Sequence, residues 1–204
     1  MIPIPFDTTH PELYFHTVNG LFIPGTDRGD DVINTTFATT LRILLKLSYR
    51  EYFPIWGTCF GMEMLLEQDG HRIWNPYPAD GFHPIHFTRS AKYSRLARSF
   101  SPSFRHSLET TQSTLQNHDY GISVDDMKRH PFYRVVATSL DELGKEYVAI
   151  IESKNYPIYG VQFHPESSNE PFLDFFHSEL KKNSHRCDSL PPVHMTAQKN
   201  HYVF

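Results

Sequence analysis

The sequence is poor in cysteine. Only two of its 204 residues are cysteines, Cys59 and Cys187. A framework of several disulfides is therefore excluded, although the two thiols could form one bond. Because Cys59 lies in a glycine-bracketed motif and Cys187 in a polar segment, we expect two independent thiols.

The sequence also lacks long apolar runs and an excess of positive charge. The formal net charge is -4, so we expect no general attraction to nucleic acid or to a membrane surface. No run approaches the roughly 20 apolar residues of a membrane-spanning helix, and no signal peptide is visible at the start. We expect a soluble protein. The sequon at Asn34 would matter only if the chain entered the secretory pathway.

The order of apolar and turn-forming residues predicts one α/β domain over residues 1–182, followed by a poorly ordered polar tail over residues 183–204. Thr9 is expected to cap the first helix. The segment 71–115 shows no sustained period, so short strands and loops are expected there, with a helical turn near residues 93–99. Helices are predicted over 11–17, 31–47 and 171–182, and strands over 20–23, 53–56, 134–138, 147–151 and 158–163.

Basic side chains are concentrated in part of this irregular segment. We interpret them as a solvated face, in preference to a wall that binds anions. They are Arg89, Lys92, Arg95, Arg98 and Arg105.

The stretch 52–63 is the strongest candidate for chemistry. An apolar run leads into Gly57-Thr58-Cys59-Phe60-Gly61, which is typical of a nucleophile held on a tight turn between a strand and a helix. A thiol at a helix N-terminus lies at the positive end of the helix dipole. We therefore expect the pKa of Cys59 to be lowered toward that of a reactive thiolate.

A cysteine nucleophile needs a base and a group that orients the base. The run 160–166 ends a predicted strand in His164-Pro165-Glu166. His164 could take the thiol proton and Glu166 could hold the imidazole ring. The alternatives are a buried structural cysteine, an ordinary surface or core histidine, and a surface acid.

These two blocks together resemble the γ-glutamyl hydrolase family of the class I glutamine amidotransferase-like superfamily. The blocks 53–61 and 156–166 carry most of the resemblance, and 19–25 and 115–118 extend it in the same order. The resemblance implies a flavodoxin-like, mixed but mostly parallel sheet with helices on both faces. It also implies a cysteine hydrolase that needs no cofactor and cleaves γ-glutamyl amide bonds of folate poly-γ-glutamates.

The resemblance assigns roles to the matching residues. Cys59 would be the nucleophile, His164 the base and Glu166 the orienting acid. His118 would line the substrate pocket, unless it is a solvent-exposed loop histidine, and Glu63 would be a substrate contact or a structural hydrogen-bond partner. The N–H of Phe60 and the loop at Gly25 and Thr26 would hold the substrate oxygen, although the family usually has two glycines where this chain has Gly25-Thr26.

The start of the chain departs from the family. Residues 1–5 resemble its second strand, so we expect its first strand and helix to be absent from this sequence, which would make the chain truncated or a variant of lower stability. By resemblance, the protein would work in a lysosome, in a vacuole or outside the cell, and it could form a homodimer.

Two other functions stay open at this point. The same triad serves glutaminase domains that supply ammonia to a separate synthetase, and the chain could be a catalytically impaired remnant. A zinc site is disfavoured, because His83 and His86 lack a matching second pair of ligands.

Overall fold

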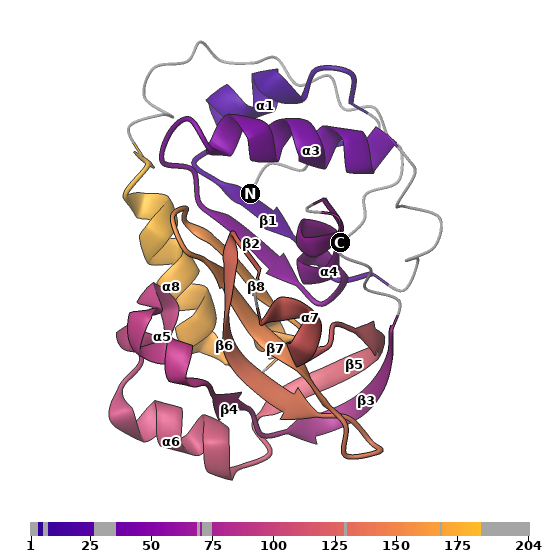
Figure 1. Ribbon diagram of the computed structural model, residues 1–204. Helices are drawn as coiled ribbons and strands as arrows, with labels where there is room; N and C mark the ends of the chain where they lie inside the picture. Colours follow the sequence, from indigo (N-terminus) through magenta and orange to yellow (C-terminus); the bar gives the residue numbers. More distant parts are fainter. Residues whose placement is uncertain are drawn as a thin grey trace.

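The computed structural model describes residues 4–5, 8–26, 36–68, 70, 75–128, 130–167 and 169–184. The strands of the main sheet are β1 (Leu21–Ile23), β2 (Ile55–Thr58), β8 (Ile158–Val161), β7 (Glu146–Ser153), β6 (Tyr133–Leu140) and β4 (His86–Phe87). Given in spatial order, they form one six-stranded sheet within the described residues (Figure 1).

The sheet is mixed. β1 pairs with β2 and β2 with β8 in parallel, whereas β7, β6 and β4 continue the sheet in antiparallel pairs. The prediction of a mixed α/β sheet is confirmed, but the expectation that it is mostly parallel is wrong for the described strands. The reason is topological: β6 and β7 are joined by a short turn, which allows only an antiparallel pair.

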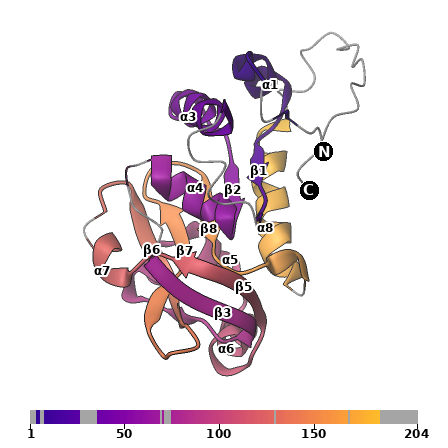
Figure 2. The same ribbon diagram turned by 90° about the vertical axis from the view of Figure 1, so that its right-hand side faces the viewer.

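Helices cover both faces of this sheet, as expected (Figure 2). One core packs beneath α1, α3, α4 and α7, and the opposite core lies beneath α5, α6 and α8. The α-helices are α1 (Pro11–Thr17), α3 (Thr36–Ser48), α4 (Phe60–Gln68), α5 (Arg95–Ser99), α6 (Pro102–Thr110), α7 (Val124–Met127) and α8 (Glu170–Lys181), and two short 3-10 helices are η1 (Arg89–Tyr93) and η2 (Pro165–Ser167).

Alternate residues of the central strands explain the two cores. Ile55 and Ile158 enter the first core, while Trp56 and Tyr159, their neighbours in sequence, enter the second. Because successive side chains of a strand point to opposite faces, a strand covered on both sides must be apolar throughout. β2 and β8 are buried at every position.

A second, two-stranded sheet is formed by β3 (Asn75–His83) and β5 (Thr114–Gly121), which pair antiparallel. It lies beside the carboxyl ends of β2 and β8 (Figures 1 and 2). The N–H of His164 donates to the carbonyl oxygen of Leu115 at 2.8 Å, which ties the end of β8 to β5.

Buried acids fasten two helices to the sheet. Glu152 on β7 accepts hydrogen bonds from the backbone N–H groups of Arg95 and Leu96 at 3.0 and 3.2 Å, and it pairs with the Arg95 guanidinium at 3.2 Å. Glu179 on α8 accepts from the hydroxyls of Tyr52 and Tyr159 at 2.6 and 2.8 Å.

The segment 71–115 is more regular than its sequence predicts. α5 confirms the helical turn expected near residues 93–99, and β3 confirms that the segment contains a strand, although β3 is nine residues long; α6 is a helix where short strands or loops were expected. β3 carries two prolines and a glycine, and it is a strand because β5 pairs with it. α6 has an overlooked start signal, since Ser101 caps the N–H of Phe104 and Pro102 follows.

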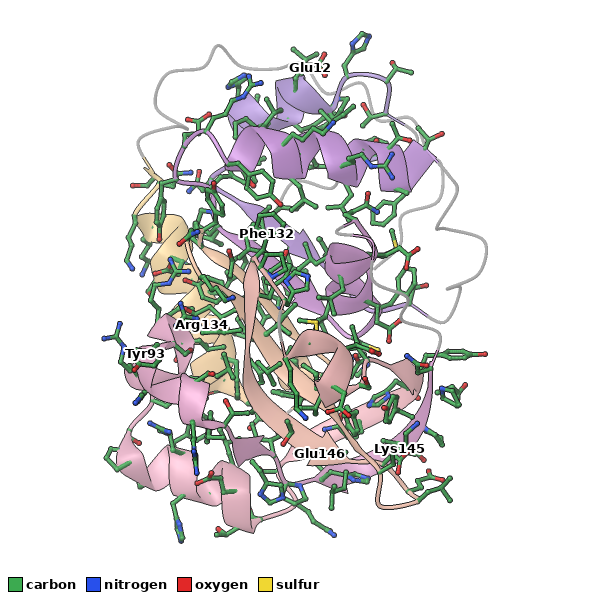
Figure 3. All side chains as sticks on the ribbon, viewed as in Figure 1. Glu12, Tyr93, Phe132, Arg134, Lys145 and Glu146 are labelled. Carbon is green, nitrogen blue, oxygen red and sulfur yellow. The ribbon has the colours of Figure 1, made fainter. Side chains whose placement is uncertain are left out.

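The basic side chains of that segment do not all form a solvated face. Arg95 belongs to the pair with Glu152, and the Arg105 guanidinium lies 4.6 Å from the centre of the Phe87 ring. On the same side of the molecule, Arg134 extends toward Tyr93 and donates to its carbonyl oxygen at 3.1 Å (Figure 3).

Some expectations for the chain ends fall outside the described residues. Ile4 and Pro5 are not in a strand, residues 1–3 are not described, and β1 is an edge strand of the sheet as described. Asn34, Cys187 and the tail from residue 185 also lie outside the residues that the structure describes. α1 begins as predicted, but His10 occupies the cap position in place of Thr9, without a side-chain capping bond.

Candidate active site

Cys59 lies on a tight turn between β2 and α4. Its φ of 51° is the one positive value of a non-glycine residue in the described part of the chain. Such a conformation costs about 1–3 kcal/mol for a non-glycine residue and persists only where the surroundings enforce it. The N–H of Cys59 donates to the carbonyl oxygen of Val161 on β8 at 2.7 Å, which holds the turn against the next strand.

Close packing explains why a glycine, Gly61, stands two residues after the cysteine. A Cβ atom on Gly61 would lie 2.1 Å from the carbonyl oxygen of Ile23 on β1, so no side chain fits. Any larger residue would push α4 away from the sheet. The left-handed backbone conformation itself belongs to Cys59 and not to the flanking glycines.

The Cys59 sulfur is buried, with an exposed fraction of 6% for the residue. It faces the carbonyl oxygen of Asn117 at 3.8 Å and the amide nitrogen of Gln162 at 3.9 Å. Burial and, next, the nearby Glu63 carboxylate raise the pKa of Cys59 to about 12, although the N–H of Phe60 acts to lower it. The expectation of a lowered pKa is therefore wrong, and the thiol needs a base to lose its proton.

His164 is the predicted base, and it lies beside this turn. It follows β8, and its Nδ1 lies 2.7 Å from Oε1 of Glu166. An Nδ1–H that donates to the carboxylate leaves Nε2 free to accept a proton. Burial acts to raise the pKa of Glu166, but the hydrogen bond from His164, a backbone hydrogen bond and the charge of His164 together outweigh it, so the net pKa is lowered and Glu166 keeps its charge.

Gly25 lies close to both Cys59 and the imidazole of His164. A Cβ atom placed on it would lie 2.9 Å from Cε1 of His164 and 3.2 Å from Cβ of Cys59. The backbone of the loop after β1, which continues into Thr26, therefore reaches the site without a side chain at Gly25. The structure thus brings the predicted residues Gly25, Cys59, His164 and Glu166 together at one end of the parallel strands.

His118 lies on β5, the strand that covers the site. It is not an exposed loop residue, because its ring packs edge-on against Tyr147 with centroids 5.0 Å apart. Its Nε2 is 3.3 Å from the side-chain oxygen of Gln116. Burial lowers the pKa of His118 to about 4, so the ring is neutral at neutral pH.

Glu63 is one helical turn beyond Cys59 and is buried, with an exposed fraction of 5%. Its Oε1 accepts a hydrogen bond from Gln162 Nε2 at 2.8 Å. Burial raises the pKa of Glu63 to about 7, and the Gln162 hydrogen bond acts in the opposite direction. Sequence reasoning overlooked Gln162, whose signal was its place two residues before His164 on the same strand end.

No group of three or more metal-ligating side chains occurs in the part of the chain that the structure describes. None of the helices described there is both long and apolar enough to span a membrane.

A mixed sheet with a cysteine turn between β2 and α4 and a histidine after β8 is the architecture of the class I glutamine amidotransferases. A sequence model of the family Glutamine amidotransferase class-I matches residues 3–182. The chain therefore belongs to that family.

Several curated relatives are γ-glutamyl hydrolases. γ-Glutamyl hydrolase B of Dictyostelium discoideum is 30% identical over an alignment 182 positions long, gaps included, which covers 82% of this chain and 52% of the relative. The Homo sapiens γ-glutamyl hydrolase is 29% identical over an alignment 222 positions long, gaps included, which covers 93% of this chain and 69% of the relative. The chain thus spans about half to two thirds of these relatives' length.

Solved structures share the fold at lower identity. A GMP synthase component from Thermoplasma acidophilum superimposes with a TM-score of 0.65 at 18% identity, over 89% of this chain and 81% of the other. The glutaminase domain of Trypanosoma brucei CTPS superimposes with a TM-score of 0.56 at 15% identity, over 84% of this chain and 74% of the other. These similarities establish the fold and carry no conclusion about substrate.

Proposed function

We propose that this protein hydrolyses γ-glutamyl amide bonds through a thioester on Cys59, and that its substrates are folate poly-γ-glutamates. The observation that carries the proposal is the grouping of a strained cysteine turn, a histidine and a carboxylate around Gly25. The names of the curated relatives support the choice of the γ-glutamyl bond over other amides.

In the first half of the reaction, His164 Nε2 takes the proton of the Cys59 thiol as the sulfur attacks the γ-carbonyl carbon. Glu166 stabilises the imidazolium that forms, through the 2.7 Å contact with Nδ1. In this mechanism the N–H of Phe60 and the backbone of the Gly25–Thr26 loop donate to the developing oxyanion.

In the second half, the imidazolium gives its proton to the leaving amine, and the C–N bond breaks to leave a thioester. Water then attacks the thioester carbonyl while His164 accepts a proton from it, which releases the carboxylic acid and restores the thiol. Glu63 on α4 acts on the thiol, and His118 on β5 follows Asn117, whose carbonyl oxygen faces the sulfur; we assign both to the walls of the substrate site.

The test is hydrolysis of a synthetic γ-glutamyl peptide by the purified chain and by Cys59→Ala. The chain contains a matched control, because Cys187→Ala removes its other thiol. Loss of activity in Cys59→Ala, with activity kept in Cys187→Ala, is the expected result. Equal activity in Cys59→Ala would overturn the mechanism, and hydrolysis of free glutamine only in the presence of a synthetase would favour an ammonia-supplying role.

A further inference from the structure

The environment of Glu63 is unusual for a carboxyl group. It is buried in the first turn of α4, and none of the described ion pairs includes it. Its partner is the amide of Gln162, which is itself fully buried, with an exposed fraction of 0%. A neutral amide offsets only part of what an ionised carboxylate loses when it leaves water.

Among the described residues, the elements that pack against α4 bring no opposing charge to this point. β2 has no titratable side chain, and the one on β8, Tyr159, lies in the core on the opposite face of the sheet. Arg42 and Lys46 on α3 are exposed to solvent. The titratable groups that interact with the Cys59 thiol are Glu63, Glu166 and Tyr147, and His164 lies beside the same turn.

Gln162 connects the carboxyl group to the sulfur. Its Nε2 donates to Glu63 at 2.8 Å and lies 3.9 Å from Cys59 Sγ. Its backbone N–H donates to the carbonyl oxygen of Ala149 at 2.9 Å, which fixes the strand end from which the side chain projects. Its Oε1 is buried and has no hydrogen-bond partner among the described residues.

We propose that Gln162 is a positioning residue that holds Glu63 against the nucleophile, so that the charge of Glu63 controls how readily Cys59 ionises. When Glu63 is ionised, its negative charge opposes the formation of a thiolate on the neighbouring turn. When Glu63 is protonated, that repulsion disappears, and its O–H becomes a donor for the Oε1 of Gln162. The pKa of Glu63 near 7 places this change within the range in which enzymes operate.

The consequence is a characteristic pH profile for the thiol. Below the titration of Glu63, the thiolate fraction rises tenfold per pH unit, as for any thiol far below its pKa. As Glu63 ionises, each gain in thiolate is offset by the new repulsion, and the profile flattens. The inference rests on the proposed function only in taking Cys59 as the nucleophile.

The test is the rate of alkylation of Cys59 by iodoacetamide from pH 5 to 9. It is measured in Cys187→Ala protein, in which Cys59 is the sole thiol. The logarithm of the rate constant should rise with unit slope and bend near pH 7. With Glu63→Gln added, the bend should vanish, and the rate at pH 8 should exceed the background by about 10-fold. A straight profile in the Cys187→Ala protein, in which Glu63 is unmutated, would by itself overturn the proposal.

Two further variants separate the groups involved. A His164→Asn change should keep the bend; loss of the bend in that variant would assign it to the imidazole and reject the role of Glu63. Gln162→Met removes the hydrogen bond that lowers the pKa of Glu63, so the bend should move up by about one pH unit. An unmoved bend in Gln162→Met, in protein with an unchanged circular dichroism spectrum, would reject the positioning role.

Alkylation requires no substrate, so the two proposals can fail separately. A bend without hydrolysis of γ-glutamyl peptides would reject the proposed function alone. Hydrolysis without a bend would reject the control by Glu63 alone.

Discussion

Nδ1 of His164 lies 2.7 Å from Oε1 of Glu166, although 46% of the Glu166 side chain is open to solvent. The two residues are separated only by Pro165, so the short run after β8 supplies both the base candidate and its orienting acid. Because solvent screens this contact, it contributes little to the stability of the fold. Its main effect is to hold the His164 ring in one tautomer.

Glu166→Gln should lower kcat for γ-glutamyl hydrolysis by about 10- to 100-fold, with little change in KM. The amide oxygen can still orient the ring, but it carries no charge to stabilise the imidazolium. Steady-state kinetics with the γ-glutamyl peptide measure the effect, and the exposed Glu142→Gln is the control. A Glu166→Gln enzyme as fast as the wild type would show that the carboxylate is not needed.

Gly25→Ala should lower kcat by about 100-fold, because the new methyl group must displace the His164 ring or the turn of Cys59. Gly121→Ala is a suitable control, since its Cβ would lie at an ordinary 3.4 Å from Cβ of Tyr77. Both variants should fold, as judged by circular dichroism. Full activity in Gly25→Ala would mean that the loop does not approach the thiol and imidazole in solution.

Glu152→Gln should destabilise the fold by about 3 kcal/mol, because it removes the charge that balances buried donors from Ser94 and Arg95. The measurement is the free energy of unfolding in urea. Asp125→Asn, which breaks the exposed pair with Lys128, should leave the unfolding midpoint nearly unchanged. Equal effects of the two changes would contradict the distinction between buried and exposed acids.

The stability of the protein should depend on pH through Glu63 in a predictable direction. Its pKa is raised from 4.5 to about 7 in the folded state, so the folded chain binds more protons than the unfolded chain between these values. Stability from this group is therefore lost as pH rises from 4.5 to 7, by about 3 kcal/mol. Glu63→Gln should lose less stability over that interval than the wild type, measured by urea unfolding at pH 5 and pH 8.

His118 should act in the opposite direction and serves as the comparison. Its pKa is lowered from 6.5 to about 4, so the folded state binds fewer protons there and stability is lost as pH falls. His118→Asn should reduce the loss of stability on acidification. If both variants followed the wild-type pH dependence, other groups would have to control it.

The elements that carry the candidate site were largely predictable. The apolar run before Cys59 and the β-rich runs up to His164 predict β2 and β8, because buried parallel strands are apolar on both faces. The helix α6 was not predicted, and the bounds and length of β3 were not either, although short strands were expected in its segment. The sequence of β3 contains Pro76, Pro78 and Gly81, which argue against a strand, and its pairing with β5 overrides that local preference.

Hydrogen bonding and burial account for what the motifs did not reveal. Gln162 looked like an ordinary strand residue, since nothing local indicates that its amide reaches both Cys59 and Glu63 from another element. The dipole of α4 is a local feature and suggested a lowered thiol pKa. Burial and the Glu63 carboxylate act through space and reverse the direction.

The sequence by itself determined the cysteine turn and the His164-Pro165-Glu166 run, because each is built from contiguous residues whose geometry is set by local sterics and hydrogen bonds. Only the tertiary structure decided that these two segments meet around Gly25, since the pairing of β2 with β8 joins residues far apart in the chain. It also decided that the pKa values of Cys59 and Glu63 are raised, because desolvation depends on what the whole fold packs around a group.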